Sequence, residues 1–122
     1  MRGLVESEEG SDGVSNCGIV LVLTNLPDRT AAMRLAALLI EQRHAACVNI
    51  LGECTSVYRW EGEVKTATEV PLLIKTSLSA YAQLEETIRA NHPYEIPEIL
   101  RIPLDGGLPA YLGWVAAECE VG

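Results

Sequence analysis

Hydrophobic and polar positions follow two periods along the chain, and these periods predict short strands and amphipathic helices. The segment IVLVLT, residues 19–24, is a continuous apolar, β-branched run that predicts a strand buried on both faces. From Ala31 onward, apolar side chains recur at i, i+4, i+7 and i+8, which predicts a helix that runs to about Arg43. Asp28 precedes this helix and is a suitable N-cap, because its carboxylate accepts hydrogen bonds from the free N–H groups of the first turn.

The next stretch predicts a β-hairpin. A β pattern resumes at Ala46, and SVYRWEGEV carries it to a turn at residues 61–62. The returning arm, residues 64–75, contains Pro71. Because proline has no N–H to donate to a ladder, Pro71 predicts a bulge, an edge position, or an N–H direction that faces away from the neighbouring strand.

A second helix is predicted from residues that cap and break helices. Ser77 or Ser79 can serve as its N-cap, and apolar residues recur on one face from Tyr81. Pro93 ends the helix near Asn91, because the residue before a proline disfavours the α conformation.

The remaining pattern completes the fold. A fourth strand, EILRIPL, leads to a turn at residues 105–107, and Pro109 begins a short third helix. Two successive βαβ halves are typical of an α+β fold, the ferredoxin-like split βαβ sandwich, here with an additional C-terminal helix. Both long helices then lie on one side of a four-stranded antiparallel sheet. Its other side has apolar strands, which favours pairing with further subunits.

Composition indicates one domain that assembles. The chain has 122 residues, and 48% of them are hydrophobic, a high share for so small a domain. Residues 1–17 are rich in Glu, Ser and Gly and predict a flexible acidic tail, followed by a folded domain at residues 18–122. No apolar run approaches the roughly 20 residues that cross a bilayer, and no secretory signal pattern is present. We therefore expect a cytoplasmic protein without a membrane partner.

Charge and motifs argue against two functional classes. A net charge of −8 without a Lys or Arg cluster does not suit a nucleic-acid partner. The four cysteines show no C-x-x-C spacing, which is typical of free thiols in the cytoplasm. A phosphate-cradling glycine loop, a G-x-S-x-G motif and a Cys-His-Asp order are all missing, so we do not expect an enzyme.

Five motifs occur in order and carry a resemblance. They are TNLPDRTAAMRLAALLIEQRHAACVNI, a Y-x-W-x-G hairpin, an E-x-x-L-L-I-K-T strand, HPYEIPEI and YLGW. Over about residues 19–118 the chain resembles the CutA family of divalent-cation-tolerance proteins. The resemblance implies a homotrimer similar to the PII proteins, with sheets facing inward, and a function in tolerance of copper and other divalent cations.

His92 and Cys47 are the candidate metal ligands. Imidazole and thiolate both suit copper or zinc. Without ligand spacing in the sequence, a complete site has to draw on several elements or subunits. The alternatives are that His92 closes a helix C-terminus favourably and that Cys47 is a small buried hydrophobe.

The matched motifs supply a second candidate site, an intersubunit cleft formed by Trp60, Glu69, Lys75, Tyr94 and Glu98. In one interpretation the cleft binds a small anionic metabolite or a metal complex. In the other, Lys75 forms a buried ion pair with Glu69 or Glu98 that fixes the trimer. The sequence thus leaves three functional hypotheses. The first is a trimer that binds copper or another divalent cation weakly, and the second is a PII-like signalling or adaptor trimer that binds a small molecule. The third is a trimer that serves mainly as a stable scaffold for assembling partners.

Overall fold

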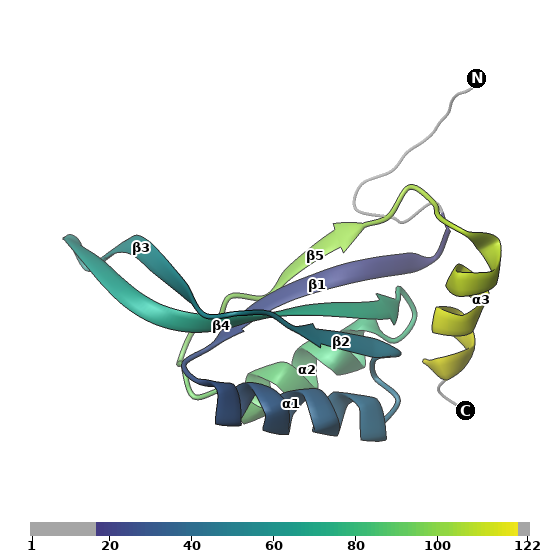
Figure 1. Ribbon diagram of the computed structural model, residues 1–122, viewed down its shortest axis with the longest axis horizontal. Coiled ribbons are helices and arrows are strands. Elements are labelled where there is room, and N and C mark those ends of the chain that lie inside the picture. The colour runs from purple at the N-terminus through teal and green to yellow at the C-terminus, as the bar shows by residue number, and fades with distance from the viewer. Residues whose placement is uncertain (1–16, 120–122) are drawn as a thin grey trace.

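The computed structural model describes residues 17–119, which form an antiparallel sheet with two helices packed on one face (Figure 1). A third helix stands at one end of the sheet. The elements are β1 Ile19–Leu26, α1 Arg29–Glu41, β2 Cys47–Ile50, β3 Cys54–Trp60, β4 Glu63–Ser77, α2 Tyr81–Asn91, β5 Leu100–Pro103 and α3 Pro109–Glu118.

The long strand β4 organises the sheet. The strand order is β2-β4-β1-β5, and β3 pairs with β4 alone. All pairings are antiparallel. The second half of β4 lies between β1 and β2, whereas its first half pairs with β3 and projects from the body as a hairpin (Figure 1).

Fully buried side chains alternate with partly buried ones along most of β1, and the buried ones form part of the core. Val20, Val22 and Leu26 are buried on the face that α1 and α2 cover, where they meet Leu35 and Leu84. This burial removes apolar surface from water on a helix-covered sheet face, which is the main favourable term in folding such a domain. The strand predicted at residues 19–24 is confirmed and extends two residues further.

The opposite face of the sheet has no helix over it. The side chains on this open face alternate with the buried ones, and in the ladder of β1 with β4 and β5 the large aliphatic ones are Leu21, Leu23, Leu73, Leu100 and Ile102. Ile102 is 39% exposed and Leu100 51%. The chain by itself therefore presents an apolar sheet face to solvent.

The predicted second strand is in fact two strands, so the described sheet has five strands rather than four. Ile50 pairs with Leu72 and Cys54 with Glu69, so β2 and β3 run against β4 in registers that differ by one residue. Pro71 lies opposite this break, where its carbonyl accepts a hydrogen bond from the N–H of the residue after β2. The Pro71 nitrogen, which carries no hydrogen, thus faces the irregular segment between β2 and β3. For this reason the central strand β4 tolerates a proline at this position.

Helix α1 begins as predicted and ends earlier than predicted. The Asp28 Oδ1 atom accepts a hydrogen bond from the Ala31 N–H at 2.8 Å, which confirms the N-cap. The helix ends at Glu41, and Arg43 follows with a φ of 61°. This left-handed residue closes the end of the helix, and its guanidinium donates to the Ala117 carbonyl of α3 at 2.9 Å.

The predicted cap of α2 is wrong in position. The N-cap residue is Ala80, which makes no side-chain cap hydrogen bond. Ser77 instead caps the turn that precedes the helix, because its hydroxyl accepts a hydrogen bond from the Ala80 N–H at 3.1 Å. Ser79 contacts the Ser77 hydroxyl instead of the helix. The predicted end is confirmed, with the last helical residue at Asn91.

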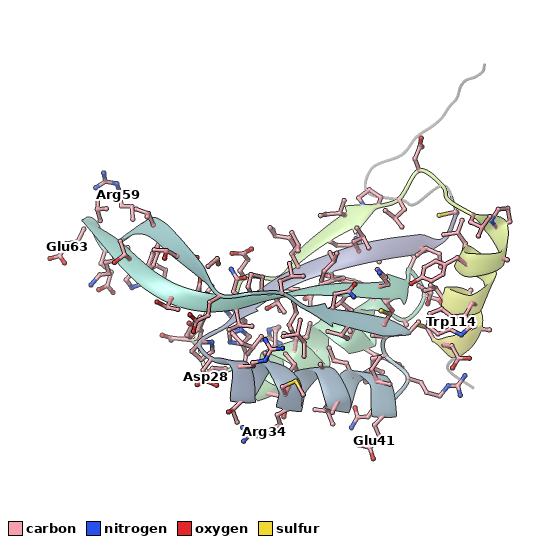
Figure 2. All side chains as sticks on the ribbon, viewed as in Figure 1. Asp28, Arg34, Glu41, Arg59, Glu63 and Trp114 are labelled. Carbon is pink, nitrogen blue, oxygen red and sulfur yellow. The ribbon has the colours of Figure 1, made fainter. Side chains whose placement is uncertain are left out.

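Helix α3 packs only part of its surface. Val115 and Cys119 are buried against the end of the sheet, whereas Tyr111 and Trp114 remain about two-fifths exposed (Figure 2). Ala116, one residue after the buried Val115, is exposed. Within residues 17–119 no helix combines the length and apolar character that a membrane span requires.

The predicted acidic tail lies almost entirely outside the described residues. Cys17, its last residue, is half-buried, and its thiol lies 3.7 Å from the Leu104 carbonyl.

Candidate functional site

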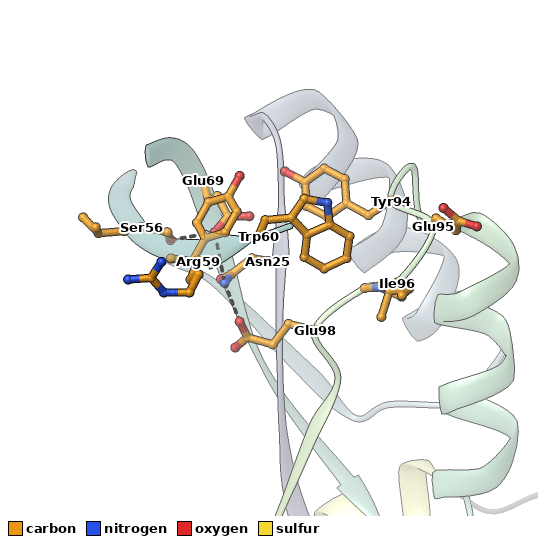
Figure 3. A pocket seen from close by; sticks show the side chains of 12 residues that line it. Asn25, Ser56, Arg59, Trp60, Glu69, Tyr94, Glu95, Ile96 and Glu98 are labelled. Carbon is orange, nitrogen blue, oxygen red and sulfur yellow. Dashed lines mark hydrogen bonds between the residues drawn. The ribbon is translucent and has the colours of Figure 1, made fainter. Parts of the chain in front are cut away.

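A groove of about 810 Å³ lies where the hairpin meets the segment after α2 (Figure 3). The hairpin contributes Ser56, Tyr58 and Trp60 from β3, and the other wall comes from residues 94–98. Trp60 is 47% exposed, so the groove is open to solvent along its aromatic wall. The groove combines aromatic surface with a few polar groups, as small-molecule sites do.

Asn25 joins the two walls of the groove. Its Nδ2 atom donates to Glu69 Oε1 at 3.4 Å and to Glu98 Oε1 at 3.2 Å. Ser56 adds a hydrogen bond from its hydroxyl to the same Glu69 oxygen at 2.6 Å. One amide thus holds two carboxylates from distant parts of the chain, drawn as dashed lines in Figure 3.

Tyr94 belongs to the same network. Burial raises the pKa of its phenol, and the charge of Glu69 and a hydrogen bond to that carboxylate raise it further. Each cause favours the neutral hydroxyl, which can donate to the Glu69 carboxylate. Tyr94 therefore stands in the groove as an uncharged donor.

His92 fixes the loop that carries Tyr94. Its Nε2 atom lies 2.7 Å from the Asn25 carbonyl, and its Nδ1 atom lies 3.1 Å from the Tyr94 backbone N–H. Because a carbonyl only accepts and an N–H only donates, Nε2 carries the proton and Nδ1 accepts. The two rings also contact each other, with centroids 4.9 Å apart. Both nitrogens of His92 are thus engaged within the chain.

The structure does not bring His92 and Cys47 together within one chain. Cys47 pairs with Lys75 on β4, whereas the Asn25 carbonyl that His92 contacts belongs to the residue opposite Pro71. These positions on β4 are four residues apart, or ~13 Å. Among the residues that the structure describes, no group of three or more His, Cys, Asp or Glu could hold a metal ion. A metal site shared by these two residues stays a prediction that needs more than one chain.

Lys75 lies away from the other predicted cleft residues. Glu69 is six residues from it along the same strand, which is ~20 Å. The ammonium of Lys75 lies instead 5.8 Å from the centroid of the Tyr111 ring. The ion pair predicted between Lys75 and Glu69 or Glu98 is therefore not formed within the chain, because six residues of extended strand separate Lys75 from Glu69, and Glu98 lies beside Glu69 at Asn25.

Four predicted residues do meet in the groove: Trp60, Glu69, Tyr94 and Glu98. Asn25 and Ser56, which connect these residues, are not among those predicted from the sequence. Asn25 follows an apolar strand directly, and a polar residue at such a strand end was the signal that could have found it. Ser56 carried no such signal, since serine is common in exposed strands and turns.

The two bridged carboxylates of the groove, Glu69 and Glu98, have no ion-pair partner among the described residues. Between residues 17 and 119 the ion pairs are Lys65 with Glu63 and Arg89 with Glu86, and neither involves Glu69 or Glu98. Arg59 lines the groove, but its guanidinium is directed to the Gly62 carbonyl of the hairpin turn, at 3.5 Å. Figure 2 shows Arg59 at the tip of the hairpin with Glu63.

Comparison with known proteins finds relatives of one family. The family described as CutA1 divalent ion tolerance protein matches residues 20–118. The Divalent-cation tolerance protein CutA of Thermus thermophilus is 44% identical over 95 residues, which make up 78% of this chain and 92% of that protein. Protein CutA, chloroplastic, of Arabidopsis thaliana is 39% identical over 111 residues. That match covers 91% of this chain but only 59% of the plant protein.

A solved structure has the same arrangement of elements. The crystal structure of CutA1 from Oryza sativa matches with a TM-score of 0.83 at 37% identity, covering 91% of this chain and all of that one. The mixed α/β fold of residues 17–119, an antiparallel sheet with three helices, is thus the fold of CutA1 structures. The sequence match and the structural match agree, and the chain belongs to the CutA1 family of divalent ion tolerance proteins.

Proposed function

We propose that the protein acts in tolerance of divalent cations, copper among them, as a cytoplasmic homotrimer that binds the metal weakly and catalyses no reaction. The family carries this proposal, since the relative from Thermus thermophilus is named a divalent-cation tolerance protein and is 44% identical. The cation is the cargo of the protein in this proposal.

The open face of the sheet supports assembly. Leu23, Leu73 and Leu100 lie beside one another on that face, and α1 and α2 cover only the other. Burying apolar surface between subunits contributes about 25 cal/mol per Å². The strand order β2-β4-β1-β5, in which β3 follows β2 along the same partner strand β4, suits a ferredoxin-like sandwich. Three such sheets facing inward would form a PII-like trimer.

Weak metal binding follows from the available ligands. Cys47 offers a half-buried thiol on the open face, and thiolates suit copper. His92 offers Nδ1 only after the metal displaces the Tyr94 N–H, and that hydrogen bond opposes binding. A site therefore draws on one or two ligands from each chain, with further ligands from neighbouring subunits.

The test is a calorimetric titration of the reduced, metal-free protein with Cu²⁺. We expect saturable binding at a fixed ratio of metal to chains, lost in Cys47→Ala and weakened in His92→Ala. Cys54→Ala is the matched control, because Cys54 is an exposed thiol on β3 and reports whether any thiol suffices. Binding that survives both Cys47→Ala and His92→Ala, or that only Cys54→Ala removes, contradicts the proposed ligands.

The groove favours a second candidate function, binding of a small molecule that signals through the trimer. Trp60, Tyr94 and a bridged pair of carboxylates surround an open volume of about 810 Å³. Lys75 can join them only from a neighbouring subunit, so an intersubunit cleft that contains Lys75 stays a prediction.

A further inference from the structure

The side chains of the groove determine which charge its ligand carries. Glu69 and Glu98 accept from one Asn25 nitrogen at 3.4 and 3.2 Å, which keeps the two carboxylates within about two hydrogen-bond lengths of each other. Asn25, Ser56 and Tyr94 are all neutral donors, and neutral donors do not cancel two negative charges. Neither carboxylate has an ion-pair partner in residues 17–119, and the Arg59 guanidinium, which also lines the groove, is directed to the Gly62 carbonyl. An anionic metabolite would be repelled by Glu69 and Glu98, so the ligand class that fits is a cation.

A bare metal ion does not suit this arrangement. The atom between the two carboxylates is the Asn25 Nδ2, whose hydrogens point to both of them and repel a cation at that place. Divalent metals require several converging oxygen, nitrogen or sulfur ligands, and the described residues offer no such group. The cation must therefore bring its own hydrogen-bond donors.

The walls of the groove fit an organic cation. Trp60, Tyr58 and Tyr94 supply aromatic faces, which attract ammonium groups and pack against the methylenes between them. Figure 3 shows the hairpin and the loop contributing to one space, with Glu98 on the side of the loop. A quaternary ammonium has no N–H to donate to the carboxylates, whereas a primary ammonium has three.

We infer that the groove binds a linear aliphatic diamine or polyamine, with its ammonium groups on Glu69 and Glu98 and its methylenes on Trp60. Two ammonium groups balance the charge of two carboxylates, and a short chain of methylenes lets each ammonium group donate to one of them. This inference rests on the second candidate function, ligand binding in the groove, and uses neither Cys47 nor His92 as a ligand.

The experiment is a calorimetric titration of the full chain, as purified, with 1,4-diaminobutane at low ionic strength. We expect one site per chain. Glu98→Gln should weaken binding about tenfold, because a hydrogen-bonded charge pair is lost. Glu41→Gln is the matched control: it removes the same charge from the exposed end of α1, far from the groove (Figure 2), and should change affinity less than about twofold. Trp60→Leu should weaken binding without changing net charge.

Further titrations separate the alternatives. Mg²⁺ carries the same charge as the diamine, and if it displaces the diamine equally well the binding is only counterion attraction, which overturns the inference. Equal effects of Glu98→Gln and Glu41→Gln, or no saturation, overturn it too. If a short lysine peptide binds more tightly than the diamine, the occupant is a protein segment. If citrate binds and the diamine does not, the inference fails while ligand binding in the groove stands. None of these titrations tests Cys47 as a copper ligand.

Discussion

At the scale of single residues, Tyr81 and Tyr94 show how burial and a neighbouring carboxylate act together on a phenol. Burial, a hydrogen bond to Glu85 and the charge of that carboxylate together raise the pKa of Tyr81 to about 12. Arg101, whose guanidinium carbon lies 4.9 Å from the centroid of the Tyr81 ring, opposes it. In both tyrosines the folded chain favours the protonated hydroxyl.

These shifts give stability a defined pH dependence. A tyrosine whose pKa is raised by folding stabilises the folded protein. This contribution is fully present below the unfolded pKa of 10 and is lost as pH rises through the folded pKa, which is about 12 for Tyr81. We expect the unfolding temperature to fall across this interval, and less so in Tyr81→Phe. An ultraviolet titration of phenolate should lose its last phase in that variant. Persistence of the phase would show that another tyrosine is responsible.

His92 is a single residue that both proposed functions need, and each of them uses the same ring nitrogens. Its ring holds the groove loop through Nε2 and Nδ1, and the same nitrogens are those that a metal would need. Metal binding at His92 and an intact groove are therefore opposed in the single chain.

At the scale of elements, the hairpin of β3 and β4 depends on its turn. Glu61 and Gly62 have φ values of 50° and 82°, the positive values that a type I′ turn requires at both central positions. Glutamate adopts this conformation at a cost, whereas glycine does not. No atom lies within 4 Å of a Cβ built at Gly62, so substitution there acts through the backbone alone.

We expect opposite effects from two substitutions in this turn. Gly62→Ala should destabilise the hairpin by about 1 kcal/mol, because alanine resists a positive φ. Glu61→Asn should stabilise it by a few tenths of a kcal/mol, because asparagine followed by glycine is the preferred pair in such turns. β3 buries little, so the hairpin can open locally, and amide hydrogen exchange along β3 is the appropriate measurement. Equal exchange in both variants would exclude the turn as the element that limits opening.

At the scale of the whole molecule, the open sheet face decides assembly. If subunits cover this face, the protein should sediment as a trimer even at low concentration. Ile102→Lys places a charge on the face and should dissociate the trimer, since burying an unpaired charge costs several kcal/mol. Met33→Lys is the control, because Met33 is 53% exposed on α1, on the covered side of the sheet.

Either of two results would remove the basis for sites between subunits. One is a wild-type protein that sediments as a monomer. The other is a trimer that Ile102→Lys leaves intact, because the open face would then not be the interface.

The sequence by itself determined the elements and their kind. The apolar run of β1, the cap at Asp28, the turn before β4 and the stop at Pro93 act over a few residues, so their effects can be derived from local spacing. The same motifs indicated the family. They also singled out Trp60, Glu69, Tyr94 and Glu98, four residues that line the groove.

Only the tertiary structure decided how those elements fit together. The register change between β2 and β3 at Pro71, the place of Glu98 beside Glu69, and the bridge from Asn25 to both carboxylates depend on pairings between residues far apart in the chain. A sheet pattern states which face a side chain occupies, whereas its partner depends on register and on loops packed from elsewhere. The acidic, aromatic character of the groove follows from those long-range contacts, and for that reason the sequence did not specify the charge of its ligand.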